Sequence, residues 1–465
     1  MVLFTRVTAR DFRLLFTRCV AGRPRGPAPP VVVRVAGGTR TVRATTSDGV
    51  TLTHASPSGT EGDDLLVLSA AVLGEVEGGT DEAVTVDRPS KLRGVLRWPG
   101  GGKPRSLPVE LILPGQQHEI PAPPPLSAAT AKLLAALHEC GRCAARESGR
   151  YALSKVQLQG KAGRVVGTDG KVALLWKGFD FPFADEVLVP AVPVFGSKPL
   201  ARVTEVTLGR TATHLVVAAG PWAVWLPTDT KAKFPDVAGV VPRYAPTTVV
   251  LDRSDAVQLL PVLPGLPGGD HELRPVTLDA DGGVRVRGRA EGGEQIGEVK
   301  EVTLTRSTVS GPAARVALDR RVFARAPSLG CHTLKLTPDK PVVAEGDGLT
   351  LVAAGLDPAL IVPSAVRSSA TSTEVGLPVR PDCSHPTNHE RRVPMKPPET
   401  NGHTPRGDPA DPLDLAEELR AALADAAGKA ARLVAPLRQS KKEKRALSAV
   451  LTNLKQLNLG AGGPR

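Results

Sequence analysis

Apolar residues recur at helical spacing in three stretches of the chain that lie about 120 residues apart. Residues 8–19, 127–140 and 252–263 each carry Leu or Ala pairs three to four positions apart. This spacing gathers apolar side chains on one face, so each stretch predicts an amphipathic helix. Ser127 and Asp252 precede two of the runs, and we expect each to cap the N-terminus of its helix.

Alternating apolar and polar positions follow each predicted helix and indicate strands. Residues 39–52 and 163–175 alternate around an Asp-Gly pair, which is a strong hairpin signal. Residues 284–296 form a weaker third copy of the same pattern.

A second short helix is predicted in each third of the chain. The three segments are residues 66–75, 189–196 and 317–328. Pro193 weakens the middle helix. A strand pair follows each segment, for example residues 203–208 with 214–219.

The repeated order predicts an α+β fold of three tandem domains, each with two helices packed on an antiparallel sheet. Pro-rich junctions at 121–125 and 242–246 separate them. We expect domains over residues 1–122, 123–243 and 244–367. Residues 368–411 have too little apolar content to fold and predict a disordered linker, whereas leucine stripes predict a helical tail over 412–460.

Length and composition agree with this picture. A chain of 465 residues is too long for one hydrophobic core. Apolar residues make up 41% of it and aromatic residues only 3%, so Val, Leu and Ala must fill cores built mainly from strands. Five irregularly spaced cysteines favour a reducing compartment. Because the start lacks a basic-then-apolar leader and no apolar run has membrane-spanning length, we expect a cytoplasmic protein without a membrane partner.

The charge balance is basic. The chain has 59 Lys and Arg against 47 Asp and Glu, which gives a formal net charge of +12. An extended polyanion is therefore a more natural partner than an acidic small molecule. Many basic bacterial proteins bind no nucleic acid, so the charge alone leaves the partner open.

Residues with catalytic or metal-binding potential are sparse. A Cys-x-x-Cys pair at Cys140 and Cys143 and a Cys/His group around Cys383 lack the four-ligand spacing of a zinc site. Residues 163–171 are Gly-rich, but Val172 follows where a phosphate-binding loop needs Ser or Thr. We therefore predict no catalytic residue, no metal site and no cofactor. An enzyme assembled from residues distant in the sequence is the weaker alternative.

Four short segments resemble those of a known family. They are Gly-Arg-Pro at 22–24, Arg-Tyr-Ala-Leu at 150–153 followed by Val-Val-Gly-Thr-Asp-Gly at 165–170, Lys-Phe-Pro-Asp at 233–236, and Leu-Ile-Val-Pro at 360–363. In order and spacing they resemble the bacterial beta sliding clamp, the processivity subunit of the replicative DNA polymerase. The Phe-Pro-Asp phrase is the most specific match, because the family closes its second domain with it.

The resemblance implies a DNA clamp fold in which each chain forms half of a ring around double-stranded DNA. Two chains would join head to tail and tether DNA polymerase and clamp loader subunits to the duplex. A ring that slides needs Lys and Arg on helices facing its bore and no base-reading residues. The expected DNA-binding residues are Arg10, Arg13 and Arg18, then Arg23 and Arg25 in the loop, then Lys132, Arg142 and Arg146, and finally Arg320, Arg321 and Arg325. Any one of these also fits an ordinary solvated helix face, and their recurrence in every copy favours the bore.

The family binds partner peptides in a cleft between its second and third domains. By resemblance, the cleft positions are Leu153, Thr168, Gly170, Lys171, Val172, Pro235, Val240, Ile361, Val362 and Pro363. Two positions depart from the family, because Gly239 stands at a basic position and Ser364 replaces a methionine.

The chain continues well beyond residue 366, where such clamps normally stop. Gln456, Leu457 and Leu459 resemble the short motif that partners insert into the cleft, so we hypothesise that the tail binds its own cleft or a neighbour's. An ordinary helix end with leucines on one face is the alternative. For the whole protein, the alternative function is a diverged clamp-fold scaffold that binds partner proteins without encircling DNA.

Overall fold

The structure is a computed structural model that describes residues 1–20, 28–59, 62–115, 122–146, 151–269, 271–290 and 297–363. The chain divides into two compact units, Met1–Gly376 and Leu377–Arg465, and every described residue belongs to the first. The predicted linker, the predicted helical tail with Gln456, Leu457 and Leu459, and the loop with Arg23 and Arg25 lie outside the described residues.

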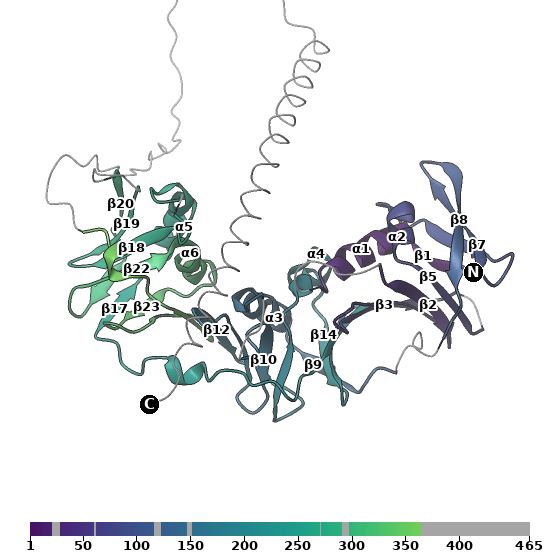
Figure 1. Cartoon of the computed structure of the whole chain (residues 1–465), viewed down its shortest axis with the longest axis horizontal. Helices are drawn as coiled ribbons and strands as arrows, with labels where there is room; N and C mark the ends of the chain where they lie inside the picture. The colour runs from purple at the N-terminus through teal and green to yellow at the C-terminus, as the bar shows by residue number, and fades with distance from the viewer. Residues whose placement is uncertain are drawn as a thin grey trace, which may run out of the picture. The chain divides into compact units, whose positions relative to one another are not determined.

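The elements recur in three successive sets (Figure 1). The first set is β1 (Val2–Thr5), α1 (Arg6–Thr17), β2 (Pro30–Ala36), β3 (Thr39–Thr45), β4 (Thr51–Pro57), β5 (Asp64–Ser69), α2 (Ala71–Val76), β6 (Ala83–Asp87), β7 (Arg93–Gly100) and β8 (Lys103–Ile112). The second set is β9 (Leu126–Ala129), α3 (Lys132–Cys143), β10 (Lys155–Gln159), β11 (Arg164–Thr168), β12 (Val172–Lys177), β13 (Glu186–Pro190), η2 (Pro193–Gly196), α4 (Lys198–Ala201), β14 (Val206–Arg210), β15 (His214–Ala219), β16 (Trp222–Pro227) and η3 (Ala238–Val240). Each set begins with a strand and a helix.

The third set repeats the order with one added strand. It comprises β17 (Thr247–Val250), α5 (Arg253–Val262), η4 (Leu263–Gly265), β18 (Pro275–Ala280), β19 (Val284–Arg289), β20 (Val299–Leu304), β21 (Thr308–Ser310), β22 (Ala314–Asp319), α6 (Arg320–Ser328), β23 (Thr333–Leu336), β24 (Val342–Glu345), β25 (Leu349–Ala353) and η5 (Pro358–Leu360). The predicted α+β architecture of three tandem domains is therefore confirmed.

Helix starts follow the local hydrogen bonding. Asp252 caps α5 as predicted, because its side chain accepts hydrogen bonds from the Ser254 and Asp255 amides at 2.8 and 3.4 Å. The predicted cap at Ser127 is wrong. Ser127 lies in β9 opposite Leu208, so sheet pairing has claimed its backbone, and α3 starts five residues later without a side-chain cap.

The second helix of each set starts later than its pattern indicated. The first residues of the predicted segments lie in β5, β13 and β22, because the buried apolar runs there are strands. In the middle copy Pro193 begins a 3-10 turn, followed by the short α4. The predicted Asp-Gly hairpins β3–β4 and β11–β12 are confirmed, with Gly49 and Gly170 at φ of 83° and 90°.

Sheet pairing continues across the predicted domain boundaries. The strand order is β1-β6-β7-β8-β5-β2-β3-β4-β16-β15-β14-β9 in a 12-stranded sheet and β13-β10-β11-β12-β25-β24-β23-β17-β21 in a 9-stranded sheet, with β20-β19-β18-β22 in a 4-stranded sheet. The β4–β16 pair joins the first domain to the second, and the β12–β25 pair joins the second to the third. Both are antiparallel.

Each domain has one strand equivalent to β4 and β12 and one equivalent to β16 and β25. The two that form no junction are β20 of the third domain and β8 of the first, and they do not pair with each other. β20 follows the hairpin strand β19 as β12 follows β11, and it is an edge of its sheet. β8 ends the first domain as β16 ends the second, and residues 103–110 pair with β7 on one side. The first unit thus carries one free counterpart of each junction strand.

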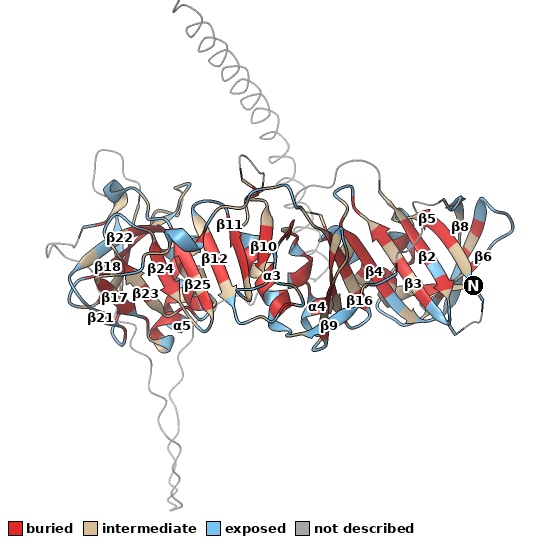
Figure 2. Cartoon of the chain, turned by 90° about the horizontal axis from the view of Figure 1, so that it is seen from below, coloured by how far each residue is buried: buried red, intermediate tan, exposed pale blue. Residues whose placement is uncertain are grey.

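Buried and exposed residues alternate along strands such as β7, whereas β10 and β18 are buried at consecutive positions (Figure 2). One continuous core cluster includes Phe12, Leu158 and Leu278, one from each domain. A smaller cluster lies apart from it, where Val237 packs with Leu175, Val352 and their neighbours. In Figure 1, α1, α3 and α6 lie on the same side of strands β3, β10 and β23.

Candidate functional site

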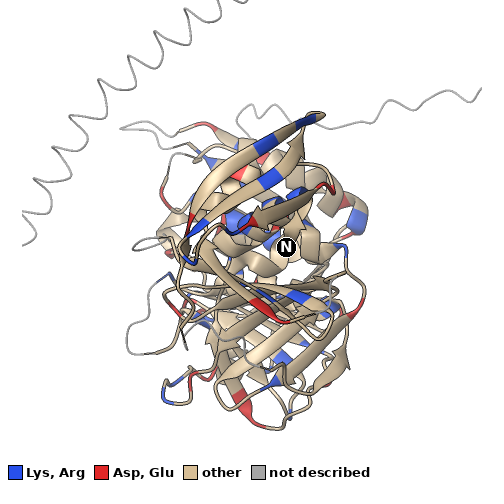
Figure 3. Cartoon of the chain, turned by 90° about the vertical axis from the view of Figure 1, so that its right-hand side faces the viewer, with Lys and Arg blue, Asp and Glu red and all other residues tan. Residues whose placement is uncertain are grey.

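Cations lie on one helix of each domain, as the sequence predicted. Arg10 and Arg13 lie on α1 and Arg18 forms its C-cap. Lys132 and Arg142 lie on α3 with Arg146 just beyond it, while Arg320, Arg321 and Arg325 lie on α6. Figure 3 shows Lys and Arg on helices at the end of the first unit that carries the N-terminus.

Most of these cations already hold a carboxylate. Arg13 makes a bidentate pair with Glu77 at 2.6 Å for both hydrogen bonds, and Arg10 pairs with its neighbour Asp11 at 2.9 Å. Arg321 donates to Asp319 at 2.8 Å. The side chains of Arg13 and Arg321 remain 50% and 62% exposed, so their other N–H groups face solvent.

Glu139 joins α3 to α6. Arg325 donates to a carboxylate oxygen and to the carbonyl oxygen of Glu139, both at 3.0 Å, and its other terminal nitrogen donates to the Cys143 sulfur at 3.2 Å. Arg142 donates to the two carboxylate oxygens of Glu139 at 3.1 and 3.2 Å. Burial on its own would lower the pKa of Arg325, but Cys143 and Glu139 raise it above the ordinary value. Arg325 therefore carries a charge that is fixed in position.

Charges on three elements act on His138, which lies on α3. Burial lowers the pKa of this histidine, and the positive charges of Arg142, Arg18 and Arg325 lower it further, while Glu139 opposes them. The direction of this shift favours a neutral imidazole, although the Glu139 carboxylate lies 3.9 Å from its Nε2 atom.

A cavity of about 460 Å³ opens between the C-terminus of α3 and the N-terminus of α6. Its lining includes four arginines and two aspartates, namely Arg142, Arg146, Arg321, Arg325, Asp169 and Asp319. Cations therefore outnumber carboxylates. Each guanidinium has five N–H donors in a planar group. An arginine that is paired with one carboxylate can therefore still donate to a phosphate.

Arg320 corrects one prediction. Its side chain does not reach solvent, because the residue is only 4% exposed and its guanidinium donates to the carbonyl oxygens of Pro264, Leu266 and Pro267. Burial lowers its pKa, and the charge of Arg274 adds to that effect. Arg320 thus fastens the loop after α5 to α6 and is not a phosphate contact.

The middle of the predicted cleft is a tight turn between β11 and β12. Thr168 donates to the Val172 carbonyl oxygen at 2.8 Å and accepts from the Gly170 amide at 3.0 Å. The Asp169 side chain accepts from the Lys171 and Val172 amides. A Cβ added at Gly170 would lie 4.0 Å from a methyl carbon of Leu153, so these two predicted positions are neighbours.

The other predicted cleft positions lie around this turn in different settings. Val362 is buried, and its amide donates to the Thr277 hydroxyl at 2.8 Å, which ties residues 361–363 to β18. Val240 is 56% exposed at the end of η3, and Pro235 lies at intermediate burial. Of the ten positions, only Val172 lines either of the two cavities described here. Leu153, Ile361 and Pro363 do not line them.

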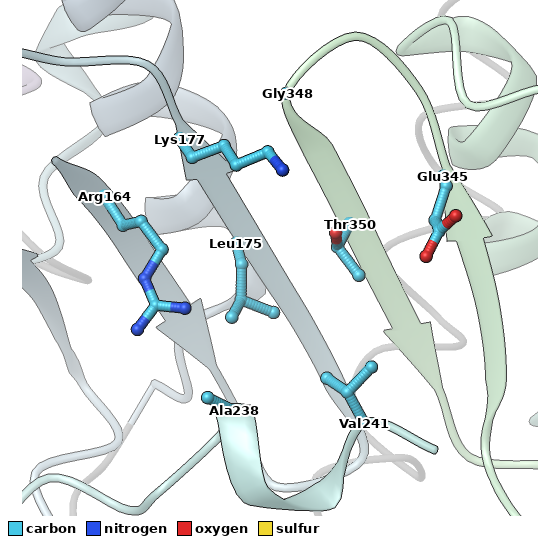
Figure 4. Close-up of a pocket in the computed structure, with 8 residues that line it drawn as sticks. All are labelled: Arg164, Leu175, Lys177, Ala238, Val241, Glu345, Gly348 and Thr350. Carbon is cyan, nitrogen blue, oxygen red and sulfur yellow. The ribbon is translucent and has the colours of Figure 1, made fainter. Parts of the chain in front are cut away.

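The second cavity, of about 220 Å³, was not predicted. It lies on the junction sheet, and its lining is Arg164, Leu175, Lys177, Ala238, Val241, Glu345, Gly348 and Thr350 (Figure 4). Figure 4 shows Arg164 on β11 and Lys177 on β12 on either side of Leu175, with Lys177 extending toward the strand of the third domain that carries Thr350. Alternation along β11 and β12 places these residues on one face, which was the signal available in the sequence.

The segment with the Phe-Pro-Asp phrase covers the same sheet face. Phe234, Val237 and Val241 pack on Leu175 and Val352. Asp236 accepts a hydrogen bond from the Gly239 amide at 3.0 Å, and a Cβ at Gly239 would lie 2.6 Å from the other Asp236 oxygen. Glycine therefore fits this turn at the position where the resembling family has a basic residue.

The cysteine pair is part of the core. Cys140 is fully buried, and its sulfur lies 3.5 Å from the Val165 carbonyl oxygen. Burial raises the pKa of the Cys140 thiol, so the thiolate that a metal would need is disfavoured. Among the described residues, no group of three or more His, Cys, Asp or Glu side chains is placed to hold a metal ion. In the same part of the chain, no helix combines the length and apolar character needed to cross a membrane.

Comparisons with known proteins identify the fold. No family model matches the sequence, and no curated protein matches it. Among solved structures, it is similar to a sliding clamp (DNA polymerase III subunit beta) from Pseudomonas aeruginosa bound to griselimycin, with a TM-score of 0.62 and 16% identity over 77% of this chain and 99% of that one.

Two other solved structures are similar to the same extent. The DNA polymerase III beta subunit from Thermotoga maritima has a TM-score of 0.59 and 15% identity, covering 77% of this chain and 99% of that one. A putative beta subunit from Eubacterium rectale has a TM-score of 0.61 and 12% identity, covering 77% and 100%. The chain therefore has the clamp fold, at a low sequence identity.

Proposed function

We propose that this protein is a divergent sliding clamp, which encircles double-stranded DNA as a ring of two chains and tethers DNA polymerase to it without catalysing a reaction. The observation that carries the proposal is the positive field of the cavity that Arg142 and Arg146 of the second domain line together with Arg321 and Arg325 of the third. Such a field attracts phosphates without reading bases, which is what sliding requires. The clamp fold of its structural relatives supports the same function.

The free strands β8 and β20 support a ring. They are the counterparts of the strands that pair at the two internal junctions, so two chains arranged head to tail would place β20 of each beside β8 of the other. A head-to-tail contact yields a closed ring when its rotation completes a circle. We propose domain boundaries at 1–122, 123–243 and 244–367 and a cytoplasmic location.

DNA polymerase and clamp loader subunits are the proposed protein partners, and the proposed docking site is the turn of β11 and β12 with its surroundings. The turn is ordered by Thr168 and Asp169, and Leu153 and Val172 supply apolar surface beside it. We retain the proposal that the tail motif Gln456, Leu457 and Leu459 competes for this site. Deleting residues 456–459 should raise the affinity of the protein for a partner peptide. An unchanged affinity would refute the proposal that the tail competes for the docking site.

A scaffold that binds proteins without encircling DNA is the second candidate. It is favoured by the ion pairs that Arg10, Arg13, Arg142 and Arg321 make within the chain, since each carboxylate offsets part of the field that a duplex would meet. Exposed ion pairs of this kind are weak, so phosphates would compete for these guanidinium groups.

Retention on circular DNA separates the two candidates. We expect the full chain to stay on closed circular duplex and to leave after the circle is cut, with retention falling as salt rises. The double variant Arg142→Ala and Arg321→Ala should lower retention. Arg97→Ala on β7 should not, although Arg97 is about as exposed as Arg321 and pairs with Asp87 of β6. Equal loss from circular and linear DNA would favour the scaffold.

A further inference from the structure

The free edge of β8 differs from the junction strands it resembles. The Leu111 amide donates to the Leu92 carbonyl oxygen at 2.9 Å, which fixes the hydrogen-bonding alternation of the antiparallel β7–β8 pair. Residues 104, 106, 108 and 110 therefore direct their backbone groups away from β7. Within residues 103–110 these are the positions that a further strand would meet.

Proline occupies two of these positions, Pro104 and Pro108. Proline has no N–H group, so the edge offers donors only at Ser106 and Glu110, although all four carbonyl groups are present. Native sheets use proline on edge strands in this way to discourage pairing with another strand.

At the place of Pro104 both internal junctions carry a donor. The place of Pro108 is also a proline in β16, Pro227, whereas beyond β25 it is Ala354, whose amide donates to the Lys171 carbonyl oxygen at 2.8 Å. The Ala55 amide donates to the Pro221 carbonyl oxygen at 2.8 Å, so Ala223 and Trp225 face β4. The Lys177 amide donates to the Gly348 carbonyl oxygen at 2.8 Å, so Thr350 and Val352 face β12. Counted from the two-residue turn of each hairpin, Pro104 stands where these strands have Ala223 and Thr350.

The side chains beside these positions differ as well. Trp222 and Val224 of β16 are buried, as are Leu349 and Leu351 of β25. The matching residues of β8 are Lys103 and Arg105, and both are exposed. The free hairpin therefore places cations near its tip where the internal junctions bury apolar side chains (Figure 3).

The opposite edge, on β20, has no such gaps. The Ala290 amide donates to the Glu298 carbonyl oxygen at 2.9 Å, so residues 299, 301 and 303 face away from β19. These are Val299, Glu301 and Thr303, and each has an N–H group. In a contact between β8 and β20, the missing backbone N–H donors would therefore be those of β8 alone.

We propose that β8 is an incomplete closing edge, which receives β20 of a second copy of this chain less tightly than β16 and β25 bind their partner strands within the chain. The proposal rests on the proposed ring for the identity of that occupant. Each contact would lack two hydrogen bonds donated by β8 and would set Lys103 and Arg105 against a strand rather than in solvent. The association of two chains would then be weaker than two complete strand contacts would make it, and it would depend on concentration.

Restoring the donors tests the proposal. The double variant Pro104→Thr and Pro108→Thr adds two N–H groups, and since one hydrogen bond contributes about fivefold to an equilibrium constant, the dissociation constant of the dimer should fall by about 25-fold for each contact. The matched control is Pro99→Thr on β7, which stands opposite Pro104 in the same hairpin and has its backbone directed away from β8. Sedimentation velocity of the full chain without DNA, over a range of concentrations, gives the readout.

A second variant keeps the test independent of how threonine fits. Arg105→Leu restores an apolar residue at the matching inward position and should also strengthen association. The proposal is overturned if the unmodified chain stays dimeric at nanomolar concentration, if neither variant strengthens association, or if Pro99→Thr acts as strongly as the double variant. Because DNA is absent, a variant that dimerises but is not retained on circular duplex would count against the proposed function and not against this edge.

Discussion

His54 makes the junction between the first two domains sensitive to acid. The residue lies on β4 opposite Trp222 of β16, only 9% exposed, with the two ring centroids 4.4 Å apart. Burial lowers the pKa of His54 to about 4, the charge of Arg40 adds to this, and Asp11 opposes it. Above its ordinary value of 6.5 the imidazole is neutral in both states, so the junction keeps its full stability there.

Acidification should weaken this junction in a defined interval. As the pH falls from 6.5 toward 4, the unfolded chain binds a proton that the folded chain rejects, and stability is lost progressively. Linkage with a pKa of about 4 in the folded state gives a loss of about 2 kcal/mol between pH 7 and pH 5. Below pH 4 both states are protonated and the loss levels off.

Urea unfolding of the full chain at pH 7 and pH 5 measures this loss. The variant His54→Phe keeps an aromatic ring against Trp222 and removes the titrating group, so its stability should change less between the two pH values. The difference between the two proteins cancels every other group that titrates in the interval. Equal losses in both would show that His54 is protonated in the fold or does not hold the junction.

Three further predictions concern other contacts. Gly167→Ala should lower stability by about 3 kcal/mol, because its Cβ would lie 2.0 Å from a carbonyl oxygen of α3, whereas Gly265→Ala, with nothing within 4 Å, should leave the melting temperature unchanged. Arg325→Ala should cost about 2 kcal/mol by removing the charged hydrogen bonds between α6 and Glu139, while Arg142 still pairs with this carboxylate; a double-mutant cycle with Glu139→Gln should be non-additive, and additivity would refute the coupling. Arg320→Ala should lower stability by about 2 kcal/mol in denaturant titrations without changing the salt dependence of DNA binding, and a changed salt slope would restore it as a phosphate contact.

Local patterns predicted the repeat because each unit has short-range signals of its own. The Asp-Gly turns at 48–49 and 169–170 and the Asp252 cap depend on residues within a few positions, and the structure contains all three. Ser127 failed because a strand far along the chain, β14, claims its backbone. Propensity is a weak guide where tertiary pairing decides.

The site was harder to predict than the fold. The sequence indicated arginines on helices but could not separate Arg320, whose guanidinium is consumed by three carbonyl oxygens, from Arg321, which is exposed. Nor could it anticipate the link from Arg325 to Glu139, because the two residues are 186 positions apart. Spatial neighbours of this kind have no signature in a single sequence.

The strand pairs β4–β16 and β12–β25 have a consequence for any attempt to isolate one domain. Residues 123–243 alone would carry β12 and β16 as bare outer strands, and these are complementary because each pairs with the other's counterpart in the intact chain. We expect such a fragment to associate with itself through these strands. In the intact chain the partner strands belong to the same molecule. They therefore meet at an effective concentration that is set by the chain and does not fall on dilution. Covalent connection thus makes the two strand contacts β4–β16 and β12–β25 independent of protein concentration.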